Sequence, residues 1–220
     1  MNAAAAPAAR YRAHVAKVWA KEPADGAHDL GHLARVWANA RTIGLDEQAD
    51  NHPDLDWQVL EAAVWFHDLV NLPKDSPDRA RASTLSAEAA VEFLRGDGFA
   101  DAKLPAVAHA IAAHSFSAGI PPETPEARIL QDADRLEALG AMGLARMFLI
   151  SGRMGGGIVD MDDPMALHRP LDDKRFALDH LEVKLLGLPA TMQTRAGRAM
   201  AEERAEWMMS FRTRLLSELG

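Results

Sequence analysis

Apolar residues recur along most of this chain at the three- and four-residue spacing of amphipathic helices. Alternation with a period of two, rich in Val, Ile and Thr, is hard to find. The pattern therefore predicts an all-α protein. The expected helices cover residues 8–21, 29–44, 55–69, 83–95, 105–114, 127 to about 150, 172–187 and 191–218.

Residues that favour helix caps set several of the expected helix ends. Asp29 is a suitable N-cap for the second helix, and Gly44 suits the position after its end. Ser83 or Thr84 is expected to cap the fourth helix. These residues set the expected bounds of the second helix and the expected start of the fourth.

Two irregular segments separate the helical patterns. Residues 71–79 contain two prolines and several turn-forming residues, which predicts a loop directly after His67 and Asp68. Residues 152–170 contain three consecutive glycines and several aspartates, and form the longest stretch without helical periodicity. A loop of that length is a candidate lid over a binding site.

Length and composition indicate one globular domain. A chain of 220 residues, 48% of them hydrophobic, can bury one sizeable core, so residues 1–220 are expected to form a single domain. Cysteine is absent, which excludes disulfides, thiolate metal sites and thiol nucleophiles. The formal net charge of −8 opposes nonspecific binding to nucleic acid, which needs clustered Lys and Arg.

No segment of the sequence predicts export or membrane insertion. The first ten residues are rich in alanine but lack a charged leading region and a long apolar stretch. No later stretch approaches the roughly 18 consecutive apolar residues of a membrane span. We therefore expect a cytoplasmic protein that does not contact a membrane.

Four polar side chains at helical positions indicate a metal site. His67 and Asp68 stand side by side at the end of an apolar helical run, where an imidazole and a carboxylate can bind one divalent ion. His32 and Asp134 lie on helix faces that also carry apolar residues one turn away. An ionisable group that faces the core needs a partner, and a shared cation would satisfy all four.

The order of these motifs resembles the HD-domain metal-dependent phosphohydrolases. The matching stretches are His28-Asp-Leu-Gly-His32, Phe66-His-Asp-Leu69 and Gln131-Asp-Ala-Asp-Arg135. The resemblance is closest to small single-domain bacterial members, some of which are nucleotide pyrophosphohydrolases, and extends over about residues 10–215. It implies a single helical HD-domain bundle whose metal site lies within about 28–140, with the C-terminal helices of 172–218 packed on it.

The resemblance also implies the ligands. The family's metal ligands fall on His32, His67, Asp68 and Asp134, with Asp132 expected to orient a ligand or a basic side chain. Two imidazoles and two carboxylates suit one Mn²⁺, Ni²⁺, Co²⁺, Fe²⁺ or Mg²⁺ ion. A second metal is not expected, because His109 and His114 are about 140° apart around a helix.

Five residues are the expected catalytic and substrate-binding groups. The implied reaction is hydrolysis, in which a bound ion activates water and polarises a phosphoryl oxygen. Asp68 would be both a ligand and a proton acceptor. Lys74, Arg79 and Arg81 are candidate phosphate contacts, Lys74 also as a catalytic group. His114 would bind substrate or protonate a leaving oxygen, although a buried histidine of the core is the alternative.

The remaining polar and aromatic residues are read as structural. His28 is interpreted as a polar cap or loop residue, and Arg35 and Arg135 as structural ion-pair partners. The residues Trp207, Met208, Met209 and Phe211 are expected to form a packing stripe, which is also consistent with a homodimer surface. No role is assigned to His14, His52, His168 and His180.

The preferred function is that of a metal-dependent phosphohydrolase of nucleotides, which cleaves a nucleoside triphosphate to a monophosphate and pyrophosphate. The alternatives are a phosphomonoesterase similar to a 5′-nucleotidase, an alarmone hydrolase, or an HD protein that senses a nucleotide or another anion without turnover. A helical interaction module with a purely structural ion is a further alternative, disfavoured because four protein ligands leave about two positions of an octahedral ion free.

Overall fold

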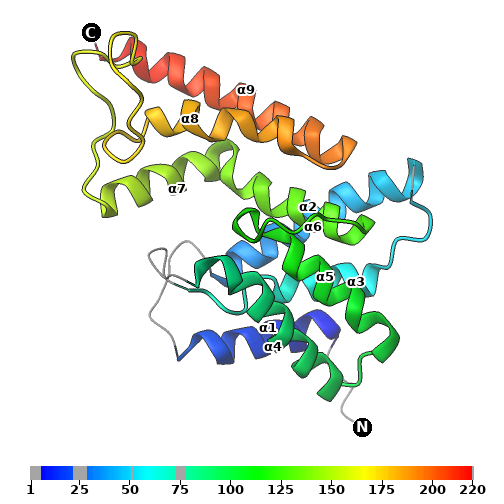
Figure 1. Ribbon diagram of the computed structural model, residues 1–220. Helices are drawn as coiled ribbons and strands as arrows, with labels where there is room; N and C mark the ends of the chain where they lie inside the picture. Colours follow the sequence, from blue (N-terminus) through cyan, green and yellow to red (C-terminus); the bar gives the residue numbers. More distant parts are fainter. Residues whose placement is uncertain (1–5, 22–28, 51, 73–77, 220) are drawn as a thin grey trace. The chain divides into compact units, whose positions relative to one another are not determined.

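The computed structural model describes residues 6–21, 29–50, 52–72 and 78–219. These residues confirm the all-α prediction: they form nine α-helices and five short 3-10 helices (Figure 1), and their one β feature is an isolated bridge between Gly157 and Phe176. The α-helices are α1 (Pro7–Trp19), α2 (Leu30–Asp50), α3 (Trp57–Phe66), α4 (Ala82–Gly96), α5 (Leu104–His114), α6 (Pro125–Arg135), α7 (Gly140–Arg153), α8 (Asp179–Val183) and α9 (Arg195–Ser217). The 3-10 helices are η1 (Arg79–Arg81), η2 (Asp101–Lys103), η3 (Phe116–Ala118), η4 (Leu136–Ala138) and η5 (Leu185–Thr191).

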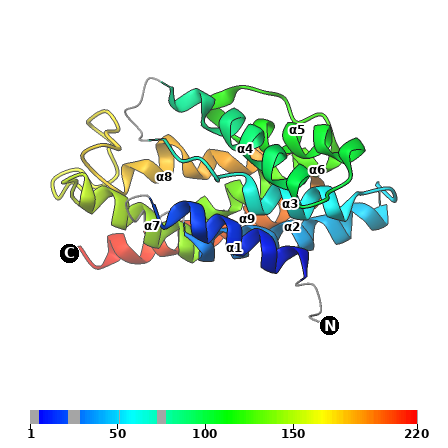
Figure 2. The same cartoon turned by 90° about the horizontal axis from the view of Figure 1, so that it is seen from below.

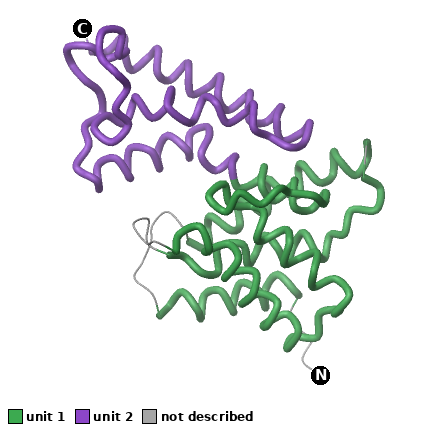
Figure 3. The backbone as a smooth tube through the Cα atoms, in the orientation of Figure 1, with its two compact units in different colours: residues 1–134 green, residues 135–220 purple. Residues whose placement is uncertain are grey.

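The chain divides into two compact units (Figure 3). The first unit covers residues 1–134 and the second covers residues 135–220. The four expected metal ligands all belong to the first unit. The single domain of residues 1–220, with the C-terminal helices packed on the site, remains a prediction.

Helix α3 is the centre of the first unit. It packs against α1, α2 and α5, while α4 lies beside α5, as both cartoon views show (Figures 1 and 2). Seven of its ten residues are buried, as expected for a helix whose only polar residues are Gln58 and Glu61. The Phe66 ring at its end contacts the rings of Tyr11 and Phe93, with centroids 5.1 and 5.3 Å away. This packing places the residue that follows, His67, inside the unit.

Helix α2 begins as predicted but extends beyond its predicted end. The Asp29 carboxylate accepts a hydrogen bond from the His32 amide at 2.7 Å, which confirms Asp29 as the N-cap. The predicted end at Gly44 is wrong, because the helix continues to Asp50. A Cβ atom at Gly44 would lie 2.8 Å from the indole of Trp57. The glycine therefore permits close packing of the two segments and does not end the helix.

The predicted cap of α4 is also wrong. The helix starts at Ala82, directly after η1, so Ser83 and Thr84 lie inside it. The Ser83 hydroxyl donates to the Ala112 carbonyl of α5 at 3.0 Å. A tertiary contact between two packed helices has replaced the local cap that the sequence favoured.

The predicted helix from 127 to about 150 is interrupted. Helix α6 ends at Arg135, η4 follows, and α7 begins at Gly140. Leu139 is extended, with φ −115° and ψ 163°, and Gly140 has φ +70°, a left-handed conformation that glycine adopts most readily. The interruption leaves Asp134 close to the end of α6.

The second unit corrects the prediction of a helix over 172–187. Residues 173–178 form turns on either side of the bridge residue Phe176, and the Asp172 carboxylate accepts hydrogen bonds from the amides of Lys174 and Arg175. Helix α8 has only five residues, and η5 replaces the rest. Such turns are an alternative to helix that Asp side chains favour. The lid role of residues 152–170 remains a prediction.

The expected packing stripe on α9 is only partly buried. Met208 is fully buried, whereas Trp207 and Met209 are about half exposed. The Trp207 ring stacks on Phe211 with centroids 6.2 Å apart. The homodimer and the cytoplasmic location remain predictions. In the described part of the chain, none of the helices combines the length and the apolar character that a bilayer crossing requires.

Candidate metal centre

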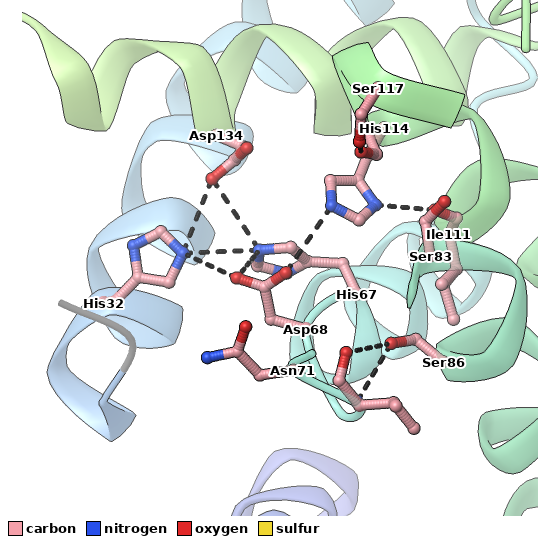
Figure 4. A network of polar contacts seen from close by, with 12 residues as sticks. His32, His67, Asp68, Asn71, Ser83, Ser86, Ile111, His114, Ser117 and Asp134 are labelled. Atoms are coloured by element: carbon pink, nitrogen blue, oxygen red, sulfur yellow. Dashed lines mark hydrogen bonds and ion pairs between the residues drawn. The ribbon is translucent and has the colours of Figure 1, made fainter. Parts of the chain in front are cut away.

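Four side chains from three helices of the first unit converge on one point (Figure 4). His32 lies in the first turn of α2, directly after its Asp29 cap. His67 is the C-cap residue of α3, and Asp68 follows it. Asp134 lies one residue before the end of α6. The apolar packing of α3 and the capping of α2 therefore bring together side chains more than 100 positions apart in the sequence.

The donor atoms of the four side chains are close to one another. His32 Nε2 lies 3.3 Å from His67 Nε2, 3.6 Å from Asp68 Oδ2 and 3.4 Å from Asp134 Oδ1. His67 Nε2 lies 3.5 Å from the same Asp68 oxygen and 3.7 Å from the same Asp134 oxygen. Each histidine therefore directs its Nε2 atom toward the other histidine and toward both carboxylates.

The orientation of the His67 ring is fixed by the backbone. Its Nδ1 atom lies 2.8 Å from the carbonyl oxygen of Val64, so Nδ1 carries the proton and donates it to that carbonyl. In the neutral ring, Nε2 then presents its lone pair to the centre. A second hydrogen bond of this kind orients the histidine ligands of many metal sites and increases their basicity.

The spacing of these atoms fits a bound cation. An ion with ligands at about 2.0–2.2 Å holds neighbouring ligand atoms about 3.0–3.5 Å apart. The observed separations of 3.3–3.7 Å are close to that range. Both histidines are almost fully buried, while the carboxylates of Asp68 and Asp134 are 24% and 31% exposed. The residues therefore fit a divalent ion that is open to solvent on its carboxylate side.

Both carboxylates are held in the ionised form. Burial alone would raise the pKa of Asp68, but the imidazoles of His67, His114 and His32, when protonated, lower that pKa well below its usual value. Burial also opposes ionisation of Asp134, yet the imidazoles of His67 and His32, when protonated, lower its pKa. Metal binding requires the ionised carboxylate, so this electrostatic environment favours it.

His114 faces the same centre from the end of α5. Its Nδ1 atom donates to the Ile111 carbonyl at 2.6 Å, and its Nε2 atom lies 3.6 Å from Asp68 Oδ1. Burial lowers the pKa of His114, but the hydrogen bond and charge of Asp68 outweigh it and raise the pKa overall. His67, His114 and Asp134 also offer ligand atoms within 4.8 Å of one another. His114 is thus buried, as the alternative interpretation supposed, but it contacts the site.

The two aspartates of the Asp132-Ala-Asp134 stretch have different environments. Asp132 is fully buried, whereas Asp134 is the carboxylate that reaches both histidines. The structure therefore brings Asp134, the aspartate chosen from the sequence, to the centre. Arg135 lies in the second unit, where it donates to the Thr191 carbonyl at 2.6 Å, and its expected ion pair remains a prediction.

The predicted phosphate contacts have different outcomes. Arg79 donates to the Asn71 side chain at 2.9 Å and to the Leu72 carbonyl, so it braces the loop after Asp68. Figure 4 shows Asn71 beside Asp68. Arg81 is 67% exposed and forms an ion pair with Asp78 at 3.4 Å, which leaves it accessible to a ligand. Lys74 and His28 lie outside the described residues.

Sequence reasoning missed the groups that hold the backbone after Asp68. Trp19 of α1 donates its indole N–H to the Leu69 carbonyl at 3.2 Å. The Ser86 hydroxyl accepts from the Val70 amide at 3.0 Å and lies 3.3 Å from the Val70 carbonyl. These partners are 50 and 16 positions away in the chain, so no local spacing could have identified them.

The comparisons with known proteins agree with this geometry. Residues 29–139 match the HD domain family model, a span that contains all four ligand candidates. Protein YpgQ of Bacillus subtilis is 31% identical over 188 residues, which is 84% of this chain and 80% of YpgQ.

Solved structures resemble the chain over nearly its whole length. The crystal structure of Bacillus subtilis YpgQ in complex with ADP has a TM-score of 0.71 and 30% identity, and the match covers 96% of this chain and 97% of that one. An HD-superfamily hydrolase from Bacillus thuringiensis has a TM-score of 0.72 and 27% identity, with 96% and 95% of the two chains covered. The chain belongs to the HD-domain family, whose members include the HD-superfamily hydrolases.

Proposed function

We propose that this protein is a metal-dependent phosphohydrolase that cleaves a nucleoside triphosphate to a nucleoside monophosphate and pyrophosphate. One observation carries the proposal. The Nε2 atoms of His32 and His67 and one carboxylate oxygen each of Asp68 and Asp134 face a common point, at separations of 3.3–3.7 Å. Such a set of nitrogen and oxygen donors suits a divalent first-row ion or Mg²⁺.

The four side chains would hold the ion, which would supply water activation and neutralise charge on the phosphoryl group. Asp68 would have two roles, as a metal ligand and as a proton acceptor. Its Oδ2 atom faces the two histidines, and its Oδ1 atom faces His114 at 3.6 Å. An ionised carboxylate in this position accepts the proton of the attacking water.

His114 and Arg81 would serve the other end of the reaction. The imidazole of His114, whose Nε2 atom lies 3.6 Å from Asp68 Oδ1, would donate a proton to the oxygen that leaves when the phosphoanhydride bond breaks. Arg81, exposed on η1, would contact the phosphate chain and offset charge on its oxygens. Arg79 has a supporting role here, since it holds Asn71 and Leu72 in place.

Support for a nucleotide comes from a relative. YpgQ of Bacillus subtilis, 30% identical to this chain in its solved structure, has been crystallised in complex with ADP. A nucleoside diphosphate carries the base, ribose and phosphoanhydride that a triphosphate also presents. The proposal extends that ligand class to this chain.

The test is an activity screen of the purified protein with Mn²⁺ across nucleoside triphosphates, nucleoside monophosphates, an alarmone nucleotide and a generic phosphoester. Pyrophosphate released from a triphosphate supports the proposal. Orthophosphate from a monophosphate would instead identify a phosphomonoesterase, and selective cleavage of the alarmone would identify an alarmone hydrolase. Tight nucleotide binding without any product would indicate a sensor and would contradict the proposed reaction.

A further inference from the structure

An exposed aromatic ring stands next to the candidate centre without a structural reason for its exposure. Phe116 is 85% exposed, the largest value of any large apolar side chain in the described ranges. It is the first residue of η3, two positions after His114. Isolated apolar residues on a surface are common. The surroundings of Phe116 make this position different.

The position of Phe116 relative to the centre follows from the chain itself. Residues two positions apart have Cα atoms no more than about 7 Å apart. His114 in turn lies 3.6 Å from Asp68 through its imidazole. Figure 4 shows Ser117, the neighbour of Phe116, close to His114 at the edge of the polar network. The turn that carries Phe116 therefore lies within the length of a nucleotide whose phosphates occupy the centre.

The turn that carries Phe116 is preorganised. The hydroxyl groups of Ser115 and Ser117 are 3.0 Å apart and share a hydrogen bond. The amide of Gly119, which has φ +64°, donates to the Phe116 carbonyl at 3.3 Å and closes the turn. A ring on a closed turn loses less conformational freedom on binding than a ring on a flexible loop.

A basic segment lies against this turn. Helix η1 packs against η3, so Arg81 and Phe116 project from neighbouring turns of the first unit. An exposed aromatic ring and an exposed guanidinium on adjacent turns can bind the base and the phosphates of one nucleotide. The face of Phe has no hydrogen-bonding groups, so it accepts any base that can stack.

We infer that Phe116 is the stacking surface for the base of a nucleotide whose phosphates bind at the metal centre. This inference rests on the proposed function for the identity of the substrate class. It assigns binding of the base to η3, whereas the phosphates bind at the metal centre. It also implies that the site discriminates nucleotides from inorganic polyphosphates through one side chain.

The test compares a ligand with a base and a ligand without one. Binding of ADP and of pyrophosphate to the Mn²⁺-loaded protein is measured by calorimetry for the wild type, Phe116→Ala and Phe116→Trp. Because base stacking on an aromatic ring is worth about 10-fold or more in affinity, Phe116→Ala should weaken ADP binding about 10-fold and leave pyrophosphate binding unchanged. Phe116→Trp should bind ADP about as tightly as the wild type, because the indole also stacks on a base.

The control is Leu45→Ala, since Leu45 is an exposed apolar residue of α2 in the same unit. It should change neither affinity. The inference is overturned if Phe116→Ala loses affinity for ADP and pyrophosphate equally, or if its ADP affinity is unchanged. It is also overturned if the wild type does not bind ADP. Hydrolysis of triphosphates is measured separately. If the wild type hydrolyses none, but Phe116→Ala loses affinity for ADP alone, the inference is supported and the proposed reaction is contradicted.

Discussion

The two units of the chain each contain a cluster of acidic side chains, and the clusters differ in how their charges are satisfied. In the second unit, Asp179 is 2% exposed and receives two hydrogen bonds from Arg169, at 2.6 and 2.9 Å. The Asp172 amide donates to it at 2.7 Å. Asp160 lies 3.4 Å from the same guanidinium. A fixed positive charge and backbone N–H groups of the protein therefore satisfy these acids.

The cluster in the first unit is arranged differently. Asp68 and Asp134 face imidazole nitrogens, one of which presents a lone pair and not a proton because its ring donates through Nδ1. The four donor atoms point at one another (Figure 4). A buried group of this kind is stabilised when a cation binds at its centre. Convergence of donor atoms therefore distinguishes a binding site from a structural ion pair.

The largest expected effect is that of Asp68→Ala. The variant loses one ligand and the proton acceptor together, so triphosphate hydrolysis should fall by at least about 1,000-fold, or about 4 kcal/mol of transition-state stabilisation. Initial rates with Mn²⁺ measure this. Asp101→Ala, at an 81% exposed acid of the same unit, is the control and should keep full activity. Retained activity in Asp68→Ala would show that the centre is not the active site.

The second prediction concerns the acidic cluster of the second unit, at Asp179. Asp179→Asn keeps the shape of the side chain but removes the charge opposite Arg169, which is itself only 18% exposed. Loss of a buried partner should lower the free energy of unfolding by about 3 kcal/mol. Manganese binding should not change. Urea unfolding followed by circular dichroism measures the first quantity, and a concurrent loss of metal would contradict the separation of the two clusters.

The stability due to Asp179 should also depend on pH. Burial opposes its ionisation, but the hydrogen bond and charge of Arg169 lower its pKa overall. A carboxyl group with a lowered pKa stabilises the fold above the unfolded pKa of about 3.9, and this contribution is lost as the pH falls through the folded pKa. The difference in unfolding free energy between wild type and Asp179→Asn should therefore be full at pH 7 and shrink at pH 3. A difference independent of pH would contradict the ion pair.

His114→Gln tests a residue at the centre that is not among the four proposed ligands. The variant should retain manganese but lose about 100-fold in turnover, because general acid catalysis contributes about 100- to 10,000-fold. His109→Gln is the matched control on the same helix, since His109 instead accepts a hydrogen bond from the Glu123 amide at 3.0 Å. Loss of manganese in His114→Gln would place His114 among the ligands.

The smallest expected effect is that of Arg81→Ala. An exposed phosphate contact contributes modestly, so the KM for a triphosphate should rise about 3- to 10-fold, and the rise should diminish as salt is added. Arg95→Ala is the control, because Arg95 is 63% exposed and forms a similar surface pair with Asp101. An equal change in both variants would indicate a general charge effect and not a contact of Arg81.

Part of the fold could be predicted because its signals are local. Helical periodicity is present in every long helix, and the Asp29 cap depends on a residue three positions away. The extension of α2 past Gly44 could not be predicted, since that glycine serves a contact with Trp57. The break before Gly140 and the replacement of a helix by turns after Asp172 likewise depend on backbone angles and side-chain bonds that compete with periodicity.

The site likewise contains residues with a local sequence signal and residues without one. His32, His67, Asp68 and Asp134 could be selected because each lies in a short motif, and the structure brings them together. The bonds from Trp19 and Ser86 that fix the chain after Asp68 have no motif. Residues that bind a ligand are constrained in type and order, whereas residues that position them need only reach the right backbone atom.

Manganese stoichiometry measures whether side chains from α2, α3 and α6 bind one divalent ion. Wild-type protein and Asp134→Ala are dialysed against Mn²⁺ and analysed for bound metal, with circular dichroism to check the fold. We expect one manganese ion per wild-type chain and about a tenth of that in the folded variant. A wild-type protein without manganese, or an Asp134→Ala variant that binds as much as the wild type, would show that these side chains do not form the metal site.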